Sequence, residues 1–65
     1  MNTIELQQDG KLYQAEFTVV DNLITVYGNE GFEQTQVDGF TEEQAARILL
    51  RNLIRKGLIH PIEPA

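Results

Sequence analysis

Three kinds of side chain in this sequence are able to do chemistry: carboxylates, a set of basic groups near the C-terminus, and one histidine. The hydrolysis of a glycosidic bond, for example, requires only two carboxylates. Most of the acidic residues, however, fall in predicted turns, on the polar sides of predicted strands or in the first turn of a predicted helix. A catalytic pair also needs a cleft, and a small sheet beneath one helix offers little room for one. The carboxylates therefore do not indicate an enzyme.

His60 is the only imidazole that could act as a general base, or as a metal ligand shared across a dimer. The chain has no cysteine, so a single copy holds neither a thiolate site nor a histidine cluster for a metal. No Ser-His-Asp or Cys-His arrangement can be drawn around this residue. A lone histidine beside Pro61 is typical of an incidental surface residue. The sequence therefore predicts no catalytic residue, metal, cofactor or small-molecule substrate.

Four basic residues form a candidate binding surface. Arg47, Arg51 and Arg55 are spaced four apart, and Lys56 follows directly. On a helix this spacing places the arginines on one exposed flank, where they would contact phosphate groups or another anionic partner. The alternative is a solvated face supported by pairs such as Glu43 with Arg47. No aromatic residue alternates with the arginines and the net charge is −5, so nucleic acid is the less favoured partner.

Charge is distributed unevenly along the chain. Residues 1–43 hold nine acidic residues and one base, Lys11, a balance of −8; residues 44–65 hold the four basic residues and one acid, Glu63, a balance of +3. The first ten residues lack the basic and apolar regions of a signal peptide. No stretch approaches the roughly 20 apolar residues that span a bilayer. We therefore expect a cytoplasmic protein that makes no contact with membranes.

Apolar and polar residues alternate over the first 37 residues, which predicts antiparallel strands. Asp9-Gly10 predicts a two-residue type I′ turn, which places Leu6 opposite Tyr13 and collects the apolar side chains on one face. Asp21-Asn22 predicts a second two-residue turn that extends this face. A third turn over residues 28–31 leads to a polar fourth strand at the sheet edge, whose register stays open.

One helix follows the sheet. Residues 41–44 match a capping box, and the apolar residues from Ala45 to Ile54 fall within about half of a helical wheel. Gly57 is placed as a C-terminal cap. The sequence predicts an α+β fold, a ββββα meander of three to four strands with the helix packed on one sheet face. Residues 1–57 form the single domain, and residues 58–65 form an extended C-terminal tail that lies against some surface.

The junction Asp38-Gly39-Phe40-Thr41-Glu42-Glu43-Gln44-Ala45 stands between the meander and the helix. In this order it resembles the small sheet-plus-helix domain of HicB-type antitoxins. The resemblance covers only the strand-to-helix junction, where capping chemistry dictates the residues. No functional residue is carried over from it.

The sheet face turned away from the helix is the leading candidate site. The register places large apolar residues there: Leu12, Val20, Leu23, Tyr27 and, if the third turn has an even number of residues, Phe32. A solvent-facing antiparallel face is normally polar, so this pattern favours contact with another protein surface. Contact with a second copy would also stabilise a domain of 65 residues, because a chain of this size buries little surface alone. Alternatively, the tail covers this face, or scattered surface apolar residues need no explanation.

Three hypotheses follow. The first is a small non-enzymatic protein-interaction module that forms a homodimer, or binds another protein, through this second face. The next is a small regulatory protein that contacts nucleic acid or another anionic partner through the four basic residues. The last is a ligand-binding or catalytic subunit of a larger assembly, which requires a concave pocket.

Overall fold

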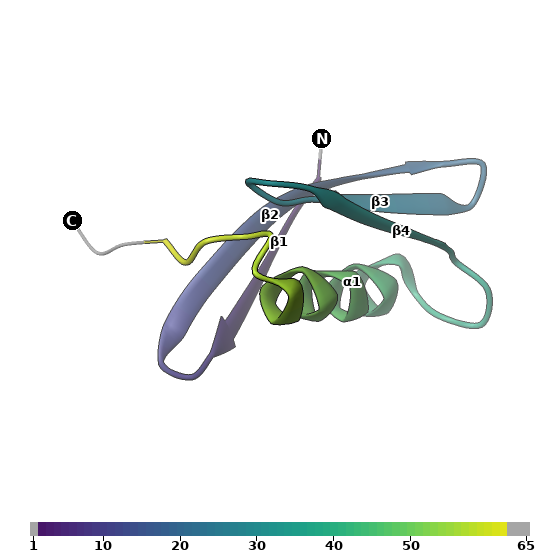
Figure 1. The fold of residues 1–65 in the computed structure, drawn as a ribbon. Helices are drawn as coiled ribbons and strands as arrows, with labels where there is room; N and C mark the ends of the chain where they lie inside the picture. The colour runs from purple at the N-terminus through teal and green to yellow at the C-terminus, as the bar shows by residue number, and fades with distance from the viewer. Residues whose placement is uncertain (1, 63–65) are drawn as a thin grey trace.

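Four antiparallel strands precede one helix in the computed structural model, which describes residues 2–62 (Figure 1). The elements are β1 (Asn2–Gln8), β2 (Lys11–Val20), β3 (Leu23–Tyr27), β4 (Phe32–Gln36) and α1 (Glu42–Lys56). The strands lie in the sheet in the order β1-β2-β3-β4. The predicted ββββα fold, with its fourth strand, is therefore confirmed.

The turns have the geometry that their residues predict. Asp9 and Gly10 have φ of 53° and 76°, the positive values that a type I′ turn requires at both central positions. Asp21 and Asn22 are also left-handed, with φ of 51° and 64°. Leu6 pairs with Tyr13 and Val19 with Ile24, so the predicted register of the first three strands is correct.

The core lies between α1 and one sheet face. It contains Ile4, Leu6, Tyr13, Ala15, Phe17, Ile24, Val26, Ala45, Ala46, Leu49, Leu50, Leu53 and Ile59. Both ends of α1 are closed as predicted. The N–H of Gln44 donates to Thr41 Oγ1 (3.1 Å) and that of Thr41 to Gln44 Oε1 (3.0 Å). At the other end Gly57 is left-handed (φ 72°), and the N–H of Leu58 donates to the carbonyl of Leu53 (2.9 Å).

Replacing Thr41 by alanine is expected to lower the free energy of unfolding by about 1 kcal/mol, because the side chain that accepts the Gln44 N–H is lost. Urea unfolding followed by circular dichroism measures this loss. Thr35→Ala is the matched control, since Thr35 is an exposed strand residue outside the cap. Equal losses in the two variants would contradict a role for the capping hydroxyl.

The C-terminal segment packs against the domain and contributes to its core. β3 pairs with residues 16–20 of β2, so residues 11–15 of β2 have no strand on that side. After α1 the chain turns back across the sheet beside β2 (Figure 1). The N–H of Ile62 donates to the carbonyl of Leu12 on this open edge (2.7 Å), and Ile59 enters the core. Residues 63–65, the rest of the predicted tail, lie outside the described residues.

Across residues 2–62, no helix combines the length and the apolar character needed to cross a membrane.

Candidate functional site

The sheet face opposite α1 exposes large apolar side chains. The exposed fractions are 63% for Val20, 57% for Phe32, 43% for Tyr27 and 39% for Leu12, and Leu23 is half-buried. Phe32 pairs with Tyr27 across a four-residue turn, so it lies on this face as the even turn predicts. The backbone of residues 58–62 bonds to Glu30 and to Leu12, at one end of this face, and Val20, Tyr27 and Phe32 stay exposed.

Four of the five predicted residues form one surface, which we call the apolar patch: Val20, Leu23, Tyr27 and Phe32. They make two cross-strand pairs, Val20 with Leu23 and Tyr27 with Phe32. The threonine pair between them is half-buried, and Thr18 Oγ1 lies 3.3 Å from the hydroxyl of Tyr27, within hydrogen-bond distance. Threonine methyl groups and an anchored tyrosine ring therefore connect the two pairs.

Leu12 does not join the patch. It lies at the other end of β2, opposite Gln7 of β1 and beside Ile62. Tyr27 pairs with Glu16, which is about 13 Å along β2 from Leu12. Polar residues and a hollow lie between Leu12 and Tyr27. The alternation of side chains along the strand placed Leu12 on the correct face. The strand register shows that it stands apart from the other four residues.

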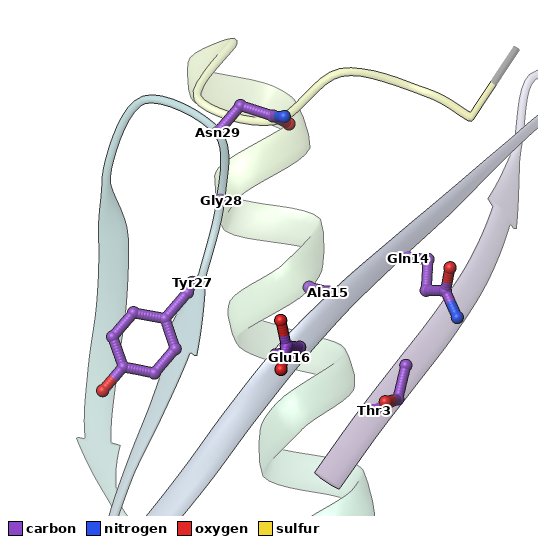
Figure 2. A pocket seen from close by; sticks show the side chains of 7 residues that line it. All are labelled: Thr3, Gln14, Ala15, Glu16, Tyr27, Gly28 and Asn29. Atoms are coloured by element: carbon purple, nitrogen blue, oxygen red, sulfur yellow. The ribbon is translucent and has the colours of Figure 1, made fainter. Parts of the chain in front are cut away.

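A hollow of about 440 Å³ lies beside Tyr27, at the end of the apolar patch (Figure 2). Its lining residues are Thr3, Gln14, Ala15, Glu16, Tyr27, Gly28 and Asn29. It forms because β3 ends at Tyr27, whereas β2 extends past this point as far as the turn that joins it to β1. Sequence reasoning missed this hollow. A signal was present, because ten residues separate the first two turns but the third strand has only five residues.

The hollow is lined mainly by polar groups. Among the described lining residues, Glu16 is the one carboxylate, and none is a histidine, lysine or arginine. Gln14 and Asn29 offer amide donors and acceptors, and Tyr27 offers an aromatic ring. The hollow thus has the concave shape that a ligand-binding subunit requires, with groups suited to a polar or cationic side chain of a partner.

The four basic residues do not form one continuous free surface. Lys56 Nζ lies 2.7 Å from Glu33 Oε2, and Arg55 donates to Asn52 Oδ1 (2.9 Å). Arg47 makes the predicted pair with Glu43 (3.4 Å). Within residues 2–62, Arg51 makes no ion pair and no side-chain hydrogen bond. The two basic residues at the C-terminal end of α1 are therefore engaged within the molecule.

A second, smaller hollow of about 250 Å³ lies on α1. Its lining residues are Phe40, Gln44, Arg47, Ile48 and Arg51. Phe40 was not among the predicted site residues. Its position directly before the helix cap was the available signal, because a side chain there lies against the first turns of the helix.

His60 has a structural role. Its ring Nε2 lies 2.7 Å from Glu30 Oε2, and its backbone N–H donates to Asn29 Oδ1 (2.9 Å). Both contacts fasten residues 58–62 to the turn between β3 and β4. The part of the chain that the structure describes contains no group of three or more side chains able to hold a metal ion.

No family model, curated protein or solved structure matches this chain. The resemblance to HicB-type antitoxins remains limited to the strand-to-helix junction at residues 38–45.

Proposed function

We propose that this chain is a small protein-interaction module that associates with a second copy of itself through the apolar patch. The observation that carries the proposal is a group of three exposed large apolar side chains and the half-buried Leu23 on the sheet face opposite α1. Exposed antiparallel faces are usually polar, and contiguous apolar groups mark contact surfaces. Tyr27 is a natural anchor, since a tyrosine offers a large apolar ring and a polar tip.

A second copy is a suitable partner for two reasons. The patch contains no charged side chain, so two patches can meet face to face around a two-fold axis without opposing charges. A domain of 65 residues also buries a small fraction of its surface, and an apolar interface adds to that fraction. Glu16 lies at the margin of the patch, which favours an axis near the Val20–Leu23 end.

Light scattering over a range of protein concentrations tests the proposal. We expect the mass to approach twice the 7.4 kDa of one chain as concentration rises. Tyr27→Glu is expected to weaken the dimer about thirtyfold or more, because a charge would be buried in an apolar interface. Phe32→Ser, a milder change on the paired residue, is expected to weaken it in the same direction.

The matched control is Gln7→Glu, which adds a charge to the same face beside Leu12 and away from the patch. It should leave the mass unchanged, and circular dichroism should show the same fold in all variants. A single-chain mass for the unaltered protein at every concentration would contradict self-association. A dimer that Tyr27→Glu and Phe32→Ser both leave intact would contradict the patch as its interface.

A further inference from the structure

The hollow on α1 combines exposed apolar groups with guanidinium groups. Arg47, Ile48 and Arg51 share one flank of α1, and Phe40 comes alongside from the preceding loop. Phe40 is 51% exposed and Ile48 41%, so both present apolar surface to solvent. The side-chain oxygen of the fifth lining residue, Gln44, accepts the N–H of Thr41, so this side chain offers a partner only its amide N–H donors. The charged groups among the described lining residues are the two arginines.

Both guanidinium groups are available to a partner. Arg51 makes no ion pair or side-chain hydrogen bond within residues 2–62. Arg47 is paired only with Glu43, at 3.4 Å and with the glutamate side chain 69% exposed. An exposed pair of this kind holds its members weakly and is easily exchanged. Lys56 and Arg55, in contrast, already have partners close by.

The size of the hollow favours a single side chain over a small-molecule ligand. Its volume of about 250 Å³ is below the range of roughly 300–1,000 Å³ that is usual for small-molecule pockets. It suits one side chain of a larger partner. Arginine binds carboxylates through two parallel hydrogen bonds, and arginine beside apolar surface is typical of the residues that dominate protein interfaces.

We infer that this hollow docks an acidic segment of another protein. One apolar side chain of the segment lies on Phe40 and Ile48, and flanking carboxylates bind Arg47 and Arg51. The complementarity of charge carries the choice of partner, and the apolar floor favours a peptide over nucleic acid. A nucleic acid would find only two guanidinium groups among the described lining residues, one of them paired with Glu43, which is few for a polyanion.

The inference is independent of the proposed dimer. α1 covers one face of the sheet (Figure 1). The hollow lies on α1, whereas the apolar patch lies on the opposite sheet face. Both surfaces can be occupied at the same time. Failure of one proposal therefore leaves the other standing, because the variants that test them are on different sides of the sheet.

Fluorescence anisotropy with a synthetic peptide tests the inference. The probe is a fluorescein-labelled peptide with one leucine between two pairs of glutamates, titrated with the full chain. We expect saturable binding that weakens about tenfold in Arg51→Glu, because a charge-assisted contact becomes a repulsion. Ile48→Ser is expected to weaken binding in the same direction, through loss of the apolar floor. Arg55→Glu is the matched control and should bind as the unaltered chain does.

Two control peptides complete the design, one with lysines in place of the glutamates and one with serine in place of the leucine. Both are expected to bind much more weakly than the probe. The inference is overturned if the probe does not bind at millimolar concentration, if Arg51→Glu binds it equally well, or if the lysine peptide matches it. A gel shift of duplex DNA at low salt that Ile48→Ser leaves unchanged would likewise overturn it in favour of nucleic acid.

Discussion

Replacing Leu53 by alanine is expected to lower the free energy of unfolding by about 3 kcal/mol, the largest effect among the stability variants. Leu53 is fully buried on α1, in the layer between the helix and the sheet. The alanine would leave a cavity that neighbouring side chains fill only in part. A chain of this length has a total stability on the order of 3–10 kcal/mol, so this loss removes about a third of it or more. Urea unfolding followed by far-ultraviolet circular dichroism measures the loss.

Ile48→Ala is the matched control for this prediction. It removes an aliphatic side chain of the same size from the same helix, but at a position that is 41% exposed. Its expected cost is below about 1 kcal/mol, since little buried surface is lost and alanine favours the helix. Equal shifts of the urea midpoint in the two variants would contradict the packing of α1 through Leu53.

Replacing Gly28 by alanine is expected to displace residues 58–62 from the edge of β2. A Cβ at Gly28 would lie 2.5 Å from the carbonyl oxygen of Leu58 and 3.2 Å from that of Gly31. Both are backbone atoms, so no side-chain rotation can relieve the overlap. We expect a loss of about 2 kcal/mol in stability, as for other overpacked sites. Hydrogen exchange should also accelerate at the amides of Glu30 and Ile62, which bond to Leu58 and Leu12.

Gly39→Ala separates this overlap from the general cost of replacing a glycine. A Cβ at Gly39 would meet nothing within 4 Å, and the cost there comes from its left-handed backbone, with φ of 77°. That strain is about 1 kcal/mol and leaves the distant amide of Ile62 unaffected. Unchanged exchange at Ile62 in Gly28→Ala would contradict the seating of the C-terminal segment against this turn.

The sheet and helix were predictable because their signals are local. Asp9-Gly10 and Asp21-Asn22 set two-residue turns, and the alternation of apolar residues then fixed the register of the first three strands. The capping box at Thr41 and the glycine at Gly57 marked the helix ends for the same reason. In each case the partners stand within a few residues of one another, so the pattern and the contact coincide.

The features that sequence reasoning missed depend on long-range geometry. Ile59 joins the core only because β3 is shorter than β2 and leaves an edge for residues 58–62. Lys56 reaches Glu33, 23 positions away, which divides the expected basic stripe. Leu12 lies on the predicted face but apart from the apolar patch, because the hollow opens between them. No local pattern encodes the first two relations, and the third follows from the unequal lengths of β2 and β3.

The seating of residues 58–62 has a consequence for self-templated aggregation. Unpaired strand edges recruit other extended chains through their free backbone groups. Residues 11–15 of β2 would form such an edge, bordered by Leu12 and with a single charge, on Lys11. The backbone bond from Ile62 to Leu12 and the burial of Ile59 close part of it from within the same molecule. The C-terminal segment thus acts as a gatekeeper, and conditions that release it would favour the growth of intermolecular β-structure along β2.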